Sequence, residues 1–356
     1  MPRCRAAAIT AAILVLIAPA AARAANYEVF IGINKTPGQP KQASANAFFP
    51  HTVTIHPGDV VTWQFQNFHT VTFPVKGEAP PPLIVLDNAL PVSGVNDAAG
   101  NPFFFNGLPS PILNPVAVAR SSTKTWNGSK VLNSGLPLSA KPKPFSLRFR
   151  RTGTFTYVCL VHPGMKGTVR VARASRRVAS PAAVTAQRLR QTRAYVADAK
   201  RVEAKAPPSG AAPTVQVGRT TPALAIYKMF PSTLTINAGQ AVTFTMAGEF
   251  RSEAHTVTFG PAKLRSGLER NFILPLIGAP AGTFGVIPQG AYPSDPPPLP
   301  AYDGTNHGDG FINTGVLDND PSTPFPNSVQ ITFTKPGTYD YECVIHAHMD
   351  GRIVVR

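Results

Sequence analysis

The sequence predicts an all-β protein built from two Greek-key β-sandwiches that a helical linker joins. Three observations support this fold class. A long stretch of the chain occurs twice, each copy consists of short runs of alternating apolar and polar residues, and glycine or proline separates the runs. Many short alternating strands with turn residues between them are typical of β-sandwiches. Because a chain of 356 residues also suggests two units, we expect one sandwich per copy.

Each copy opens with a predicted β-hairpin. Residues 49–63 (FPHTVTIHPGDVVTW) match residues 230–244 (FPSTLTINAGQAVTF) at a constant offset of 181. Both segments are predicted to form a strand, a glycine turn and a second strand. The segments 69–73 and 255–259 follow, and both are HTVTF. Alternate side chains of a strand share a face, so each histidine lies on the face of the valine and phenylalanine that follow it.

Three further strand patterns recur in the same order near the end of each copy. The middle one runs directly into a cysteine, and the last one begins with glycine. The three are residues 145–149, 154–159 and 167–171 in the first copy, and residues 329–333, 338–343 and 351–355 in the second. Together with the hairpins, they supply enough strands for a sandwich in each copy.

Residues 173–220 match neither copy and are predicted to form a basic, helical linker. Ser180 is a suitable N-cap, Pro181 suits the first turn, and Pro207 and Pro208 would end the helix. The helix is mostly polar and dominated by basic residues, so we expect a solvent-bridging spacer. These basic residues are Arg188, Arg190, Arg193, Lys200 and Arg201. Docking of this helix on a partner or a membrane surface is the alternative. The apolar stripe is thin and consists of Val184, Leu189, Val196 and Val202.

The predicted domains are residues 25–172 and residues 221–356. Both contain a long insert, because 89 residues separate the first histidine from the cysteine in the first domain and 87 do so in the second. The inserts are rich in proline and glycine. Loops of this length are usually functional or disordered. Two interpretations of the inserts remain. They form a lid or a docking face, or they are a surface elaboration without a separate role.

Residues 1–24 have the features of a secretory signal. Arg3 and Arg5 precede the apolar stretch Ala6–Ala21, and Ala22–Ala24 has the small-residue pattern of a cleavage site. An uncleaved membrane anchor is the alternative, although the apolar stretch is short for a membrane span. The signal predicts an exported protein, either periplasmic or extracellular at the cell surface, without a transmembrane span in the mature chain.

The chain is strongly basic, with a formal net charge of +16 that falls to +13 without the three arginines of residues 1–24. Such an excess favours an acidic redox partner or an anionic surface through long-range attraction. Nucleic acid is a poor alternative, because the chain is expected to be exported and contains no recognisable nucleic-acid-binding module.

The residues with the most informative chemistry form a motif that also occurs twice. Residues 159–165 (CLVHPGM) and 343–349 (CVIHAHM) each offer a thiolate, an imidazole and a thioether. His69 and His255 supply a further imidazole upstream. Two histidines, one cysteine and a weak axial methionine are the ligand set of a blue-copper electron-transfer site. A disulfide between the two motif cysteines would destroy both sites, so we expect two free thiolates.

This arrangement resembles the cupredoxins, the family of plastocyanin, pseudoazurin and amicyanin. Cys-x2-His-x2-Met at the end of a strand is most similar to the short ligand loop of amicyanin, with the remaining histidine on a distant strand. The chain departs from many family members at Thr70 and Thr256, where those have asparagine after the first histidine. The resemblance implies one copper ion per domain, with the ligands His69, Cys159, His162 and Met165 in the first and His255, Cys343, His346 and Met349 in the second.

The predicted function is that of an exported type 1 copper protein that carries electrons between redox partners, entering and leaving at His162 and His346. Copper storage or delivery through the same ligands is the alternative, and a copper oxidase or nitrite reductase comes third. Those enzymes connect a second copper centre to the blue site through a histidine beside the cysteine. The residues beside the two cysteines here are Val158, Leu160, Glu342 and Val344. Only His51, His56, His307 and His348 remain outside the two sites, so we expect no enzyme.

Overall fold

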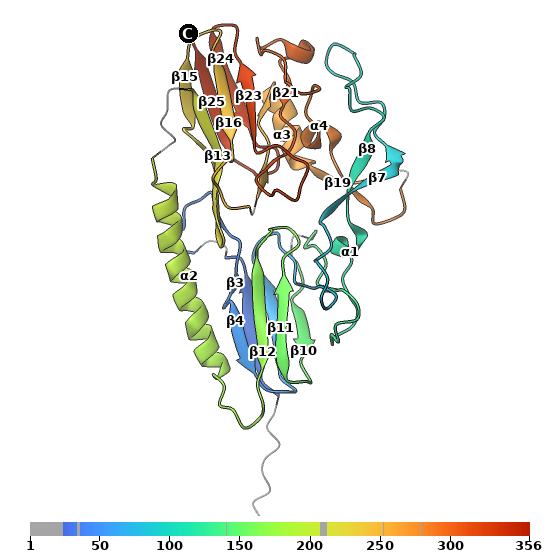
Figure 1. The fold of residues 1–356 in the computed structure, drawn as a ribbon, viewed down its shortest axis with the longest axis vertical. Coiled ribbons are helices and arrows are strands. Elements are labelled where there is room, and N and C mark those ends of the chain that lie inside the picture. The colour runs from blue at the N-terminus through green and yellow to red at the C-terminus, as the bar shows by residue number, and fades with distance from the viewer. Residues whose placement is uncertain (1–23, 34–35, 140, 207–211, 252, 278) are drawn as a thin grey trace, which may run out of the picture.

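The computed structural model describes residues 24–356 except 34–35, 140, 207–211, 252 and 278. The predicted signal therefore lies outside the described residues, apart from Ala24. Two β-sandwiches are placed end to end, the first running from blue to green and the second from yellow to red in Figure 1. The predicted all-β fold class with two sandwiches is confirmed.

The first sandwich consists of a four-stranded sheet in the order β10-β5-β1-β3 and a five-stranded sheet in the order β4-β12-β11-β6-β9. Consecutive strands repeatedly change sheet, as Greek-key connections require. The strands are β1 (Asn26–Ile31), β3 (Phe48–Phe49), β4 (Thr52–Ile55), β5 (Val60–Phe65), β6 (Thr72–Phe73), β9 (Leu132–Asn133), β10 (Phe145–Arg148), β11 (Gly153–Val158) and β12 (Lys166–Val171).

The second sandwich repeats this topology. Its sheets have the orders β2-β14-β13-β16-β23 and β15-β25-β24-β18-β21, and β17 and β22 form a separate pair. The strands are β2 (Ala43–Ala45), β13 (Thr214–Thr221), β14 (Leu224–Phe230), β15 (Thr233–Ile236), β16 (Ala241–Thr245), β17 (Ala254–His255), β18 (Thr258–Phe259), β21 (Ile312–Asn313), β22 (Leu317–Asp318), β23 (Ser328–Thr332), β24 (Gly337–Glu342) and β25 (Asp350–Val355).

Equivalent aromatic pairs fill the two cores. Trp63 on β5 packs against Tyr157 on β11, with ring centroids 5.1 Å apart in an edge-to-face arrangement. Phe244 on β16 packs in the same way against Tyr341 on β24, at 5.3 Å. Each pair joins the two sheets of its sandwich, and all four side chains are buried. Edge-to-face aromatic pairs of this kind stabilise a core beyond the burial of their area.

The second sandwich contains residues that the sequence pattern assigned elsewhere. β13 begins at Thr214, inside residues 173–220, so a strand of the second sandwich starts within the predicted linker. β2 belongs in sequence to the first predicted domain, yet it pairs antiparallel with β14, with Ala45 opposite Leu224. The hydrogen bonds of β2 thus join the two halves directly.

The two long inserts also pair with each other. β7 (Ile84–Pro91) and β8 (Pro109–Leu113) of the first insert form one sheet with β19 (Ile273–Pro275) and β20 (Phe284–Val286) of the second, in the order β19-β20-β8-β7. The short helices α1 (Pro115–Val118), α3 (Ala262–Arg270), α4 (Pro288–Ala291) and η1 (Asn306–Gly308) complete the inserts. The inserts therefore connect the two sandwiches, which neither of the open interpretations anticipated.

The predicted linker helix is present as α2 (Pro181–Glu203), and the hydroxyl of Ser180 caps it by accepting a hydrogen bond from the amide of Ala183. The predicted solvent-bridging role is wrong, because α2 lies along both sandwiches in Figure 1 and contacts β1 and β14. One face of the helix is buried in a core shared with both halves, and Leu189 is the exposed member of the predicted stripe. No helix among the described residues is long and apolar enough to cross a membrane.

Arg219 fixes the end of α2. Its guanidinium donates hydrogen bonds to the carbonyls of Val202, Glu203 and Lys205 and lies 3.6 Å from the ring centroid of Phe230. A cation at a helix C-terminus satisfies carbonyls that have no partner within the helix. This buried arginine holds the helix against the second sandwich.

A charged cluster holds the inserts together. The imidazole of His307 lies between two carboxylates, with Nδ1 3.1 Å from Asp97 Oδ2 of the first insert and Nε2 3.0 Å from Asp295 Oδ2 of the second. The hydrogen bond to Asp295 raises the pKa of His307, burial opposes this, and Asp97 adds to the rise. The folded chain therefore holds the imidazole proton more tightly than the unfolded chain does.

His307→Gln is expected to reduce the free energy of unfolding by about 1 kcal/mol in acidic solution and by less in alkaline solution. Stability that comes from a raised histidine pKa is fully present below about pH 6.5 and is lost as the pH rises through the raised value. Urea unfolding of both metal-free proteins between pH 5.5 and pH 9 measures the difference, and Asp97→Asn should reproduce part of it. A difference that does not change with pH would show that His307 contributes by packing alone.

Candidate metal centres

The first candidate centre lies at the end of the first sandwich that faces the second. His69 precedes β6, and Cys159 and His162 lie in the loop between β11 and β12. His69 Nδ1 is 2.9 Å from His162 Nδ1, and Cys159 Sγ is 3.8 Å and 3.6 Å from these two nitrogens. All three side chains are buried, so three donor atoms converge on one point.

The second candidate centre has nearly the same geometry. His255 ends β17, and Cys343 and His346 lie in the loop between β24 and β25. His255 Nδ1 is 3.1 Å from His346 Nδ1, and Cys343 Sγ is 3.8 Å and 3.7 Å from them. Both cysteines are free, as predicted.

These donor atoms fit a soft metal ion. Imidazole nitrogen and thiolate sulfur bind metals such as zinc at about 2.0 Å and about 2.3 Å, so donors three to four ångströms apart can share one ion. Burial would raise the pKa of Cys159, but hydrogen bonds from His162 and His69 lower it well below the usual value. The pKa of Cys343 is lowered in the same way. The thiolate that results is the form that binds a metal.

Met165 and Met349 lie where the motif predicts them, on the same loops and buried in the same cores as the cysteines. The amide of Cys159 donates to the carbonyl of Met165 at 3.0 Å, and the amide of Cys343 donates to that of Met349 at 3.0 Å. Each loop is therefore closed by a backbone hydrogen bond between its first and last motif residue. The structure brings together the predicted residues of each site, and their role as copper ligands stays a prediction.

The threonines that directly follow the strand histidines, Thr70 and Thr256, contribute to both centres. The amide of Thr70 donates to Cys159 Sγ at 3.4 Å, and its hydroxyl accepts from the amide of Leu160 at 2.8 Å. Thr256 makes the equivalent contacts with Cys343 Sγ, at 3.4 Å, and with the amide of Val344, at 2.9 Å. In both centres, the threonine amide therefore donates to the cysteine sulfur, and the threonine hydroxyl accepts a hydrogen bond from the loop that carries the cysteine.

Two glycines that the sequence analysis missed lie against the strand histidines. Gly32 (φ +67°) directly follows β1, and Gly218 (φ +75°) lies within β13 at the equivalent place of the second half. A Cβ at Gly32 would be 2.7 Å from His69 Nε2, and one at Gly218 would be 2.4 Å from His255 Nε2. Neither Nε2 has a hydrogen-bond partner among the described residues, so on that side of the ring only packing against the glycine holds each histidine.

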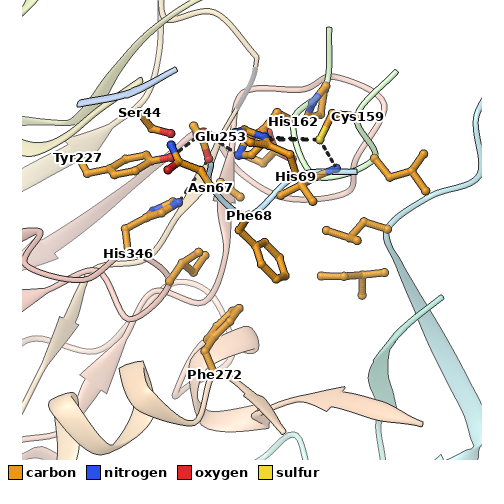
Figure 2. A pocket seen from close by; sticks show the side chains of 18 of the residues that line it. Ser44, Asn67, Phe68, His69, Cys159, His162, Tyr227, Glu253, Phe272 and His346 are labelled. Carbon is orange, nitrogen blue, oxygen red and sulfur yellow. Dashed lines mark hydrogen bonds and ion pairs between the residues drawn. The ribbon is translucent and has the colours of Figure 1, made fainter. Parts of the chain in front are cut away.

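A third missed residue, Glu253, connects the two centres. Its Oε1 is 3.3 Å from His162 Nε2, and its Oε2 is 3.3 Å from His346 Nε2. Figure 2 shows the carboxylate between the two imidazoles. Oε1 also accepts hydrogen bonds from Asn46 Nδ2 at 2.6 Å and from the Tyr227 hydroxyl at 3.0 Å. The predicted ligand histidines His162 and His346 therefore share one carboxylate.

Glu253 is ionised in this setting. Burial would raise the pKa of its carboxyl group, but attraction to His162 and a hydrogen bond with His346 lower it to about 2. The sequence points to Glu253 only through a difference between the two copies. The residue two positions before the strand histidine is Asn67 in the first copy and Glu253 in the second.

Electron entry and exit at His162 and His346 stay a prediction. These imidazole edges face each other across Glu253, and their side chains are only 6% and 14% exposed. They line a cleft of about 1610 Å³ together with residues of both halves, among them Phe68 and Phe272 (Figure 2).

The remaining histidines have other surroundings. His56 Nε2 is 2.8 Å from the carbonyl of Arg176, and the side chains of His51 and His348 are exposed. Among the described residues, the two groups of histidine and cysteine above are those in which three candidate donors converge. The structure thus gives no support to a further site at His51, His56 or His348.

Comparison with known proteins finds similarity at the level of structure. No protein-family model matches the chain, and no curated protein matches it. Among solved structures, amicyanin from Paracoccus versutus is 17% identical over 42% of this chain and 85% of its own, with a TM-score of 0.22. Auracyanin from Roseiflexus castenholzii is 17% identical over 42% and 99%, with a TM-score of 0.25. Plastocyanin from Dryopteris crassirhizoma is 24% identical over 40% and 99%, with a TM-score of 0.21. All three are cupredoxins, the family that the ligand motifs resemble.

Proposed function

We propose that this chain is a two-centre copper protein that carries electrons between redox partners. The observation that supports it best is the duplicated convergence of two imidazole nitrogens and a thiolate sulfur, each set with a buried methionine on the same loop. This is the donor set of blue-copper sites, in which copper changes between Cu(I) and Cu(II) with little change in its ligands.

The chain's own residues provide a rigid and dry surrounding. His69 and His255 are fully buried and packed against glycine, and the other ligands of each centre lie on one short loop tied by backbone hydrogen bonds. Thr70 and Thr256 orient the sulfur atoms. Such outer contacts fix the ligand positions and control access of water, both of which tune a metal's potential.

Partner, location and the absence of catalysis belong to the same proposal. The net charge of +16 favours an acidic redox partner. Residues 1–24 support export to the periplasm or the cell surface. Val158 and Leu160 flank the first cysteine, where copper enzymes of two domains have a histidine, so we propose outer-sphere transfer without a substrate on the metal.

The alternative of copper storage or delivery makes a different kinetic prediction. We expect electron self-exchange of the copper-loaded protein to be fast, and loss of copper to a chelator to be slow, because every predicted ligand is largely buried. Line broadening in NMR spectra of mixed oxidation states measures the first, and absorbance during incubation with a Cu(I) chelator measures the second. Rapid copper transfer with slow self-exchange would favour delivery, and turnover of nitrite or phenols would favour an enzyme.

A further inference from the structure

The position of Glu253 sets this chain apart from two independent copper sites joined by a linker. One carboxylate contacts a predicted ligand of each centre, through Oε1 on His162 and Oε2 on His346 at 3.3 Å each. Glu253 is 6% exposed, so this contact is shielded from solvent. Electrostatic interactions are stronger in such surroundings than in water, because the effective dielectric constant is lower.

The neighbours of Glu253 hold it in place from both halves. Asn46 follows β2 in the first half of the chain, and Tyr227 lies on β14 in the second half. The Tyr227 ring also stacks on His346, with centroids 4.0 Å apart and an interplanar angle of 12°. Burial and the charge of Glu253 raise the pKa of Tyr227, so the hydroxyl keeps its proton and donates to the carboxylate. Residues of both halves thus hold the carboxylate between the two imidazoles.

We propose that Glu253 couples the two centres, an inference that rests on the proposed function. The charge of one centre then affects the reduction potential of the other, and electrons pass between the two centres. The route runs from His162 through the carboxylate to His346, over two contacts of 3.3 Å. With copper held by both sets of residues, loss of an electron by Cu(I) in one centre would be balanced by reduction of Cu(II) in the other, so the transfer would need no further reagent. The pair of domains then acts as one two-electron unit.

The test is Glu253→Gln, which keeps the shape and removes the charge. Loss of a nearby negative charge disfavours Cu(II) relative to Cu(I) in both centres. We therefore expect the redox equilibrium constant of each centre to shift about tenfold toward Cu(I), which is about 59 mV per one-electron couple. Spectroelectrochemical titration measures both potentials, and Cys159→Ser and Cys343→Ser backgrounds assign them to the centres.

Glu342→Gln is the matched control. Glu342 precedes Cys343 and pairs with Arg265 at 3.3 Å, so it lies beside the second centre without contacting either ligand histidine. Its substitution is expected to move the potential of the second centre at most. If Glu253→Gln moves neither potential or only one, the coupling is overturned, even if both centres hold copper and exchange electrons with partners.

A metal-free measurement separates this inference from the proposed function. The ¹⁵N resonances of the His162 and His346 side chains should both move in Glu253→Gln, because both rings lose the same charged acceptor. Circular dichroism establishes that the variant is folded. Unchanged resonances would overturn the shared contact itself. A chain that shows these shifts but binds no copper would overturn the electron-transfer proposal and the coupling with it, while leaving the shared carboxylate as a structural link.

Discussion

Replacing Cys343 by serine is expected to abolish the thiolate-to-copper absorption of the second centre and to leave that of the first in place. The thiolate is the softest donor of the set and the source of the intense colour of blue-copper sites. Serine keeps the size of the side chain but cannot supply sulfur at 3.8 Å and 3.7 Å from the two nitrogens. The absorbance per chain should fall to roughly half, because each centre has the same donor set.

Cys159→Ser is the matched variant in the first half and should remove the other share of the colour. The double variant should be colourless, with its fold intact by circular dichroism, because both cysteines are free and no disulfide is lost. Retention of the full absorbance by either single variant would show that its cysteine does not bind copper.

Gly218→Ala is expected to weaken copper binding at the second centre by about ten- to one hundredfold, the usual effect of disturbing a residue that orients a metal ligand. The added carbon would lie 2.4 Å from His255 Nε2, an atom that has no hydrogen-bond partner among the described residues, so the ring would have to shift away from Gly218. Competition with a Cu(I) chelator gives the affinity, and the absorption band of the second centre reports the displaced histidine.

The same substitution at Gly239 separates the clash from backbone strain. Gly239 also has a positive φ, +87°, but a Cβ there would meet nothing within 4 Å. Both variants lose stability from an unfavourable backbone conformation, of order 1 kcal/mol. Only Gly218→Ala should change the second centre, and equal copper affinity in the two variants would contradict the role assigned to Gly218.

The sequence predicted the features that depend on neighbouring residues. Alternation of period two identified the strands around Trp63 and Phe244, and the spacing of cysteine, histidine and methionine identified both ligand loops. Ser180 and Pro181 placed the start of α2 within the structure's own bounds. Such patterns are local, so a single sequence contains them in full.

The features that were missed depend on contacts between distant segments. Ala45 pairs with Leu224, and the two inserts share a sheet, but neither pairing has a signature in the sequence. The buried face of α2 was missed because alanine, threonine and tyrosine supply much of it, as Thr192, Tyr195 and Ala199 show. These residues leave a weak apolar stripe even where a helix is well packed.

The sequence predicted which candidate donor residues converge, but it did not predict their surroundings. The motifs gave the residues that converge, but the way the two sandwiches face each other decides that His162 and His346 meet at Glu253. A single glutamate two residues before a strand histidine indicates no role in the sequence, because its contact with His162 depends on how the two sandwiches pack. The same holds for Gly32 and Gly218, whose importance lies in what packs against them.

The most direct test of the account is the visible absorption spectrum of the oxidised, copper-loaded protein, with copper counted per chain. The account predicts an intense thiolate-to-copper band in the red region and two copper ions per chain, because two equivalent donor sets are present. A colourless protein that binds no copper would contradict it and leave two β-sandwiches without an electron-transfer function.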